Sequence, residues 1–189
     1  VAGTLPIASE DPNRYRASCL LFNDQGEIVS RYDKIHLFDA FIDEGECYQE
    51  SDSTVAGNTI VTADTPWGKL GLGVCYDLRF PELFRLLAQQ GADLIALPAA
   101  FIQTTGRVHW EVLLRARAIE NSCYVIAANQ VGEHPNGRQS FGHSSIIDPW
   151  GTVIAQQPFS PGAIVSTMDQ SFLEHTRTNT PFLKHKKLS

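Results

Sequence analysis

The stretch KLGLGVCYDLRFPELFRLLAQQ (residues 69–90) decides the fold, because its periodicity changes partway along. Its first part alternates in the manner of a short buried strand that ends near Val74. From Pro81 onward the sequence is amphipathic, with a proline suited to a first helical position and Gly91 as a stop signal. The sequence therefore predicts a strand and then a helix, with Cys75 at their junction.

Cys75 has two interpretations. Backbone N–H groups at a strand–helix junction can lower a thiol pKa and hold a developing oxyanion, which favours a catalytic nucleophile. Most free cysteines are instead small buried hydrophobic residues. The local context leaves both interpretations open.

A second segment, RYDKIHLF (residues 31–38), places Lys34 between apolar residues at the end of an extended run. An ammonium in such a position needs a partner, and Glu50 follows in YQES (residues 48–51). A cysteine, a lysine and a glutamate brought together make a hydrolytic set of nucleophile, oxyanion stabiliser and carboxylate. Taken alone, Lys34 is better explained as a surface lysine and Glu50 as a loop carboxylate.

Five stretches together resemble the carbon–nitrogen hydrolase (nitrilase) superfamily, with the deaminated glutathione amidases and omega-amidases as the closest branch. The matched stretches are residues 31–38, 73–82, 109–111, 115–121 and 142–151. They occur in the family's order, and the resemblance extends from about Val1 to the region of Leu173.

The resemblance implies an α/β fold, the family's α-β-β-α sandwich, and assigns the three candidate catalytic residues. Cys75 matches the nucleophile, Lys34 the lysine, and Glu50 a second glutamate that holds the lysine and substrate in place. The general-base glutamate of the family is expected before Val1. Residues 1–189 are thus expected to form one hydrolase domain without the first strands and helix of the fold, an N-terminally truncated form.

The resemblance also implies a substrate site after the cysteine. Arg79 is expected to bind a substrate carboxylate, although an ion pair with Glu82 or Asp77 is the alternative. The implied substrate is a small omega-amide carboxylic acid such as deaminated glutathione, cleaved through a cysteine thioester.

Three further residues are assigned to this pocket by the resemblance. Phe101 and Thr105 match the loop that lines it, and Tyr76 follows the nucleophile, so its backbone N–H is the expected second oxyanion donor.

Composition is that of an ordinary soluble domain, with 43% hydrophobic and 19% charged residues in 189. The net charge of −6 gives no electrostatic case for nucleic acid. The longest apolar run, residues 94–102, is too short to span a bilayer and contains a proline. We therefore expect no nucleic-acid or membrane partner.

The four cysteines show neither a C-x-x-C pair nor zinc-type histidine spacing, so we expect no metal and no cofactor. Cys19 and Cys123 lie in apolar runs and are expected in the core, whereas Cys47 is expected to be less buried. A cytoplasmic protein is the natural interpretation. The family resemblance also implies that the protein forms a homodimer.

The remaining elements alternate between hairpins and strand–helix–strand units, which favours two sheets with helices outside. Strands are expected at 17–22 and 28–32, at 58–63 and 69–74, at 93–98, 123–129, 141–147, 152–155 and 162–168, and helices at 81–90 and 108–121. On the second helix, Glu111 and Glu120 are expected to pair with Arg115 and Arg117.

Three hypotheses for function follow. The first is a cysteine amidase of the family, and the second is a catalytically impaired remnant that keeps the fold and an interface. The third is an unrelated Cys–His hydrolase using His109 or His143. Both histidines are better explained as structural residues, the usual role of a histidine.

Overall fold

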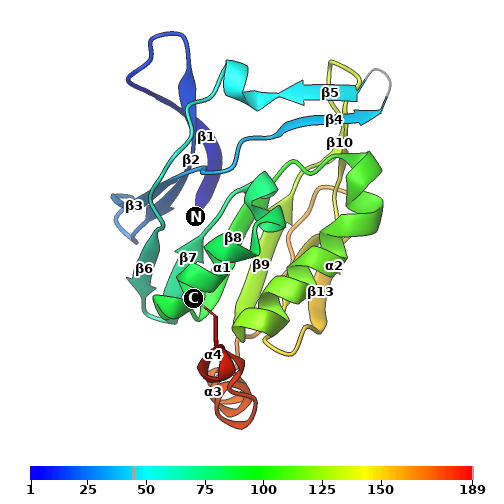
Figure 1. Ribbon diagram of the computed structural model, residues 1–189. Coiled ribbons are helices and arrows are strands. Elements are labelled where there is room, and N and C mark those ends of the chain that lie inside the picture. Colours follow the sequence, from blue (N-terminus) through cyan, green and yellow to red (C-terminus); the bar gives the residue numbers. More distant parts are fainter. Residues whose placement is uncertain (44–45, 189) are drawn as a thin grey trace.

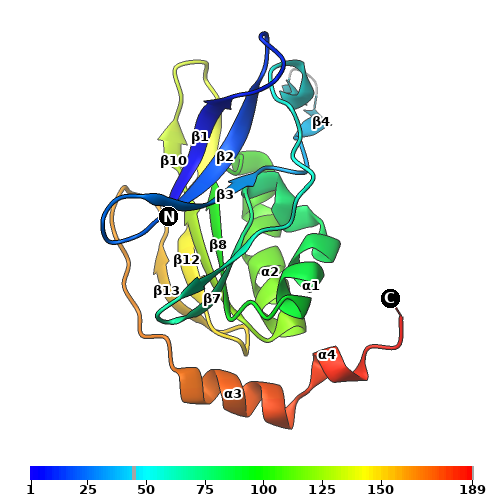
Figure 2. The same cartoon turned by 90° about the vertical axis from the view of Figure 1, so that its left-hand side faces the viewer.

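Two β-sheets face each other in the computed structural model, which describes residues 1–43 and 46–188 (Figures 1 and 2). Helices α1 (Pro81–Gln89) and α2 (Gln103–Asn121) cover one face of the larger sheet, and the smaller sheet lies on its other face (Figure 2). The chain is thus a mixed α/β structure whose layers are helices, sheet and sheet.

The larger sheet has the strand order β13-β12-β9-β8-β7-β6. Its strands are β6 (Thr62–Thr65), β7 (Gly68–Leu72), β8 (Leu94–Ala99), β9 (Tyr124–Asn129), β12 (Ser144–Ile147) and β13 (Val153–Gln157). β7, β8 and β9 are parallel, and the other neighbours pair antiparallel. Parallel strands need long crossovers, which α1 and α2 supply, so the loops at the carboxyl ends of β7 and β8 lie side by side.

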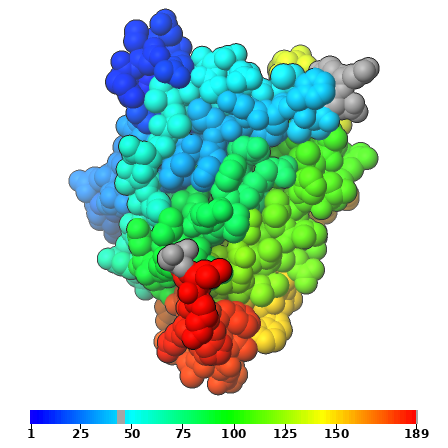
Figure 3. Space-filling model, in the orientation of Figure 1, coloured from blue at the N-terminus to red at the C-terminus, as the bar shows by residue number. Residues whose placement is uncertain are grey.

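The smaller sheet is an antiparallel arrangement of β1 (Ala2–Ala8), β2 (Tyr15–Phe22) and β3 (Ile28–Asp33). Two further hairpins, β4 (Asp39–Asp43) with β5 (Glu46–Gln49) and β10 (Val131–Glu133) with β11 (Gln139–Phe141), lie beyond the carboxyl ends of the parallel strands (Figure 1). In the space-filling view the β4–β5 hairpin crosses the upper part of the molecule (Figure 3). The hairpins therefore frame one end of the larger sheet.

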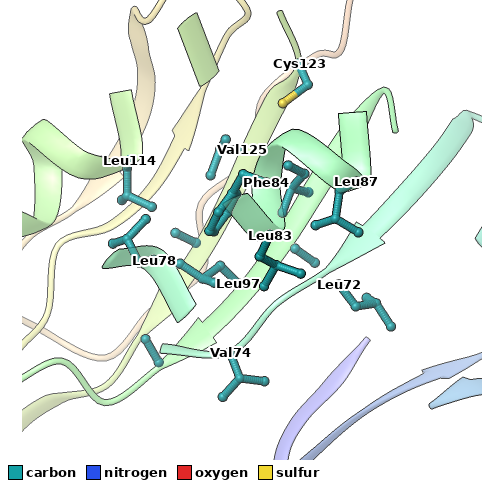
Figure 4. Close-up of a cluster of buried hydrophobic side chains, with 14 of the residues drawn as sticks. Leu72, Val74, Leu78, Leu83, Phe84, Leu87, Leu97, Leu114, Cys123 and Val125 are labelled. Atoms are coloured by element: carbon teal, nitrogen blue, oxygen red, sulfur yellow. The ribbon is translucent and has the colours of Figure 1, made fainter. Parts of the chain in front are cut away.

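The main core lies between the larger sheet and its two helices (Figure 4). Its fully buried side chains come from both layers and include Leu72, Leu78, Phe84, Leu87, Ile95, Leu97, Trp110 and Leu114. Apolar burial of this kind is worth roughly 1.5–3 kcal/mol per large side chain, so this layer holds the strand ends in place.

Helix α2 buries one apolar face against the sheet. Trp110, Leu114 and Ala118 are fully buried, whereas Ile119 is 38% exposed. The predicted ion pairs are also present, since Arg117 Nη1 lies 2.8 Å from Glu120 Oε1 and Arg115 Nη1 lies 3.9 Å from Glu111 Oε1. The helix begins at Gln103, five residues before the predicted start.

The predicted hairpins and the strand–helix–strand order are confirmed, with shifted ends. The strand expected from 58 begins only at Thr62, and the strand expected from 141 begins at Ser144. The second shift has a backbone cause, because Gly142 and His143 have φ values of +73° and +57°, outside the range of extended strands.

The predicted strand at 162–168 is wrong. This segment is irregular, and Val165 is 88% exposed. A strand needs a neighbour for its backbone hydrogen bonds, and in the described part of the chain this segment pairs with none.

Two C-terminal helices, α3 (Gln170–Asn179) and α4 (Phe182–His185), extend below the sheet (Figure 1). The Asp169 side chain caps α3 by accepting from the Phe172 N–H. Arg177 fixes the helix to the body by donating to Asp93 Oδ1 at 2.6 Å and to the Ala92 carbonyl at 2.7 Å.

No helix within 1–43 and 46–188 is both long and apolar enough to span a membrane. Over the same residues, the structure shows no group of three or more histidine, cysteine and carboxylate side chains placed to bind a metal.

Candidate active site

Cys75 lies where β7 gives way to a short 3₁₀ helix, η2 (Cys75–Arg79), which leads into α1. Its φ is +47°, a left-handed value that is uncommon for a residue other than glycine. Such strained positions cost about 1–3 kcal/mol and cluster at functional sites. The strand–helix junction predicted from the sequence is therefore present, with strain as an added feature.

A buried carboxylate holds this turn in place. Asp77 is fully buried and accepts hydrogen bonds from the Tyr32 hydroxyl at 2.7 Å, the Val74 N–H at 2.9 Å and the His36 N–H at 3.1 Å. It therefore joins the nucleophile turn to the segment that carries Lys34. Sequence reasoning treated Asp77 only as a possible partner of Arg79, and no local signal marked it as the link.

Lys34 and Glu50 form the predicted ion pair. The Lys34 Nζ lies 2.5 Å from Glu50 Oε2, and the lysine is 4% exposed. The same carboxylate oxygen accepts the Phe38 N–H at 2.6 Å. Glu50 begins the short helix η1 (Glu50–Asp52), directly after β5. Both residues of the pair are thus fixed by neighbouring backbone.

Cys75, Lys34 and Glu50 all line one cavity of about 510 Å³. Burial raises the pKa of the Cys75 thiol, and the nearby Lys34 ammonium and the Ala100 N–H offset this only in part. The resting thiol is therefore protonated at neutral pH, and nucleophilic attack requires a base to take its proton.

A second, narrow cavity of about 20 Å³ is also lined by Cys75. It contains the predicted substrate residues Arg79, Tyr76, Phe101 and Thr105. The Thr105 Oγ1 is buried and, among the described residues, has no hydrogen-bond partner. The structure thus brings all seven candidate residues to two cavities that meet at Cys75.

Arg79 forms no ion pair with a carboxylate in the described residues, so the alternative pairing with Glu82 or Asp77 is not seen. Its guanidinium lies over the Phe101 ring at 4.9 Å, with Nη1 3.1 Å from the His109 Nδ1. Burial lowers the Arg79 pKa. A half-buried guanidinium without a carboxylate is suited to an anionic ligand.

The histidines considered as bases occupy other places. His109 contacts Arg79, and His143 stacks on Phe141 with a centroid separation of 4.0 Å. No histidine of the described residues lines either cavity at Cys75. This arrangement argues against a Cys–His pair.

The other cysteines are placed as predicted. Cys19 and Cys123 are fully buried, and Cys47 is exposed. Burial raises the pKa of Cys19 to about 11 and that of Cys123 to about 12. Neither lines the cavities at Cys75.

The family model described as carbon-nitrogen hydrolase matches residues 1–178. The chain belongs to the carbon-nitrogen hydrolase family. It is 48% identical over 187 residues to a deaminated glutathione amidase of Yersinia enterocolitica, covering 98% of this chain and 65% of that relative. The chain thus spans about two thirds of the length of this relative.

Solved structures agree with the family assignment. The C. elegans NitFhit protein superposes with a TM-score of 0.91 at 41% identity, covering 98% of this chain and 45% of that one. An amidase variant from Nesterenkonia sp. AN1 superposes with a TM-score of 0.81 at 27% identity, covering 97% and 62%. That amidase was observed with the acetamide moiety of fluoroacetamide attached covalently to its active site cysteine.

Proposed function

We propose that this chain is the cysteine-bearing region of an amidase that hydrolyses a small omega-amide carboxylic acid through a thioester. The observation that carries the proposal is the strained Cys75 in one cavity with the buried Lys34–Glu50 ion pair. The family match and the covalently modified Nesterenkonia cysteine support it.

In the proposed first half-reaction a base removes the Cys75 proton and the sulfur attacks the amide carbon. The oxyanion is stabilised by the Lys34 ammonium and the Tyr76 N–H, and Glu50 positions the lysine. Collapse breaks the carbon–nitrogen bond, and the departing amine takes up a proton, leaving an acyl thioester.

In the second half-reaction water attacks the thioester carbon. The carbon–sulfur bond breaks, the carboxylic acid is released and the thiol regains its proton. The family resemblance implies that the base is a glutamate other than Glu50. We further propose the family's α-β-β-α sandwich, in a cytoplasmic homodimer.

Arg79 supports the acidic substrate class, because its guanidinium faces a cavity at Cys75 without a carboxylate partner. Deaminated glutathione is the representative substrate, by analogy with the named relatives. Its hydrolysis releases a 2-oxo dicarboxylic acid and the dipeptide cysteinylglycine.

The proposal is tested by amine release. The chain is incubated with an omega-amide acid, and ammonia or dipeptide is measured beside Cys75→Ala, with Cys123→Ala as the matched control because Cys123 lines neither cavity. We expect Cys75→Ala to abolish release and Cys123→Ala to retain most of it. Retained turnover in Cys75→Ala would rule out covalent catalysis through this residue.

The alternative is a catalytically impaired form that keeps the fold. General acid–base catalysis typically contributes about 10²- to 10⁴-fold. If the base lies upstream, a chain that includes the upstream segment of its relatives should release amine at least roughly 10²-fold faster. Equal rates would mean that a carboxylate within residues 1–189 is the base.

A further inference from the structure

A second arginine lies at the wide cavity of Cys75. Arg138 lines this cavity together with Cys75, Lys34 and Tyr48, whereas Arg79 lines the narrow one. Each of the two cavities at Cys75 is therefore lined by one arginine. Of these two arginines, only Arg79 has a role in the proposed function.

The backbone fixes Arg138 at the tip of the β10–β11 hairpin. The His134 N–H donates to the Arg138 carbonyl at 2.8 Å, and the Arg138 N–H donates to Asn136 Oδ1 at 3.2 Å. The hairpin is joined to the start of α2 by a bridge between Ile102 and Ser140. The side chain therefore projects from an ordered turn.

Among the described residues, the Arg138 side chain has no acceptor. Its Nε is buried and has no hydrogen-bond partner among the described residues, and no described carboxylate forms an ion pair with it. Lys34, the other cation of the cavity, is already paired with Glu50. A buried charged donor without an acceptor is costly, and a bound anion satisfies it.

The two cavities differ in what they accommodate. The narrow one, about 20 Å³ and lined by the buried Phe101 and Ile102, holds about one water-sized group beside Arg79. The amine must leave before water attacks, so it requires the larger space. The cavity of about 510 Å³, which reaches the exposed residues Tyr15 and Cys47, provides this space.

We propose that Arg138 binds a carboxylate on the leaving amine. The dipeptide amine of deaminated glutathione carries such a carboxylate, so Arg138 would favour amides of amino acids or short peptides over simple amides. This inference rests on the proposed function, because it takes Cys75 as the point of cleavage. It adds a specificity residue on the amine side.

The test is binding, which requires no turnover. N-glutaryl-alanylglycine and its C-terminal amide, N-glutaryl-alanylglycinamide, differ only in the carboxylate at issue. Their dissociation constants are measured by calorimetry on Cys75→Ala and on Cys75→Ala combined with Arg138→Gln, Arg138→Lys or Arg107→Gln. Arg107 is the control, an exposed arginine of α2 that lines neither cavity.

We expect Arg138→Gln to weaken binding of the acid about 10- to 150-fold, the range for a hydrogen bond to a charged group, and to leave the amide nearly unchanged. Arg138→Lys should recover part of the loss, and Arg107→Gln should change neither ligand. Equal losses for both ligands, unchanged binding of the acid, or no binding by Cys75→Ala would overturn the inference. A chain that binds in the expected pattern but releases no amine would refute the proposed function alone.

Discussion

At the residue scale, the chemistry of this site depends on two positively charged side chains with different partners. Lys34, proposed to stabilise the oxyanion, is paired with Glu50 at 2.5 Å. The Arg79 guanidinium contacts the Tyr76 and Phe101 rings and His109, and no carboxylate of the described residues pairs with it. Arg79 is therefore available for a substrate carboxylate in the narrow cavity at Cys75.

Replacing Arg79 by Leu tests this division. We expect KM for omega-amides that carry a distal carboxylate to rise about 10- to 150-fold, because a charge-assisted hydrogen bond is lost. Uncharged short amides should be affected much less, and amine release with the two substrate types is the measurement. Equal losses on both would show that Arg79 has a structural role.

Local patterns predicted where Cys75 and Lys34 lie in the fold, whereas the roles of all seven candidate residues came from the family resemblance. Cys75 follows a strand and precedes a helix start, and Lys34 ends an extended run. The roles of Asp77 and Arg138 could not be predicted in this way. Asp77 acts through partners that are distant in sequence, and Arg138 is singled out because its buried Nε has no partner among the described residues. Asp77 accepts from Tyr32, 45 residues away, and this contact exists only once the sheets have packed.

At the scale of elements, hydrophobic periodicity predicted those parts that bury one face. The strands β7, β8 and β9 and the helices α1 and α2 are of this kind. The hairpins β4–β5 and β10–β11 were not predicted, because they bury little and carry mixed polar sequence. Helix α3 had a usable signal that was overlooked, namely the capping residue Asp169.

Asp77 joins two such elements, η2 and the segment after β3, and its replacement tests that link. Asp77→Ala removes the acceptor of three hydrogen bonds in a fully buried position, leaving the Tyr32 hydroxyl and the Val74 and His36 N–H groups unpaired. We expect the free energy of unfolding to fall by about 3 kcal/mol or more.

Urea unfolding measures this loss, with Asp64→Ala as the control. Asp64 is an exposed carboxylate of β6 that pairs with Lys69 on the surface. Its replacement should have little effect on stability. A similarly small effect of Asp77→Ala would contradict the role assigned to the buried carboxylate.

At the scale of the whole molecule, the buried thiols make stability depend on alkaline pH. Burial raises the pKa of Cys19 to about 11 and of Cys123 to about 12, from an ordinary value of 9.0. The folded state keeps these protons at pH values where the unfolded chain has lost them. Their contribution is therefore complete below about pH 9 and is lost as the pH rises through the folded-state pKa values.

We expect the free energy of unfolding to fall above about pH 9 by up to about 1.4 kcal/mol per pH unit for each thiol. The slopes are measured by chemical unfolding of the native chain, Cys19→Ala and Cys123→Ala. The pH range runs from about 8 to about 11, which begins below the ordinary thiol pKa and reaches the raised pKa of Cys19. Each replacement should make the decline shallower, even where it lowers stability at neutral pH. An unchanged slope would show that other groups determine the alkaline loss.

The central claim is that Cys75 forms an acyl thioester with an omega-amide acid, and intact-protein mass spectrometry tests it most directly. The chain is mixed with the amide, quenched in acid within seconds to minutes, and digested to locate any added mass. We predict an increase equal to the acyl group on the peptide that contains Cys75, absent in Cys75→Ala and reversed as product forms. An adduct on Cys47 instead, or amine release from the native chain without any acyl-Cys75 under rapid quenching, would contradict the account.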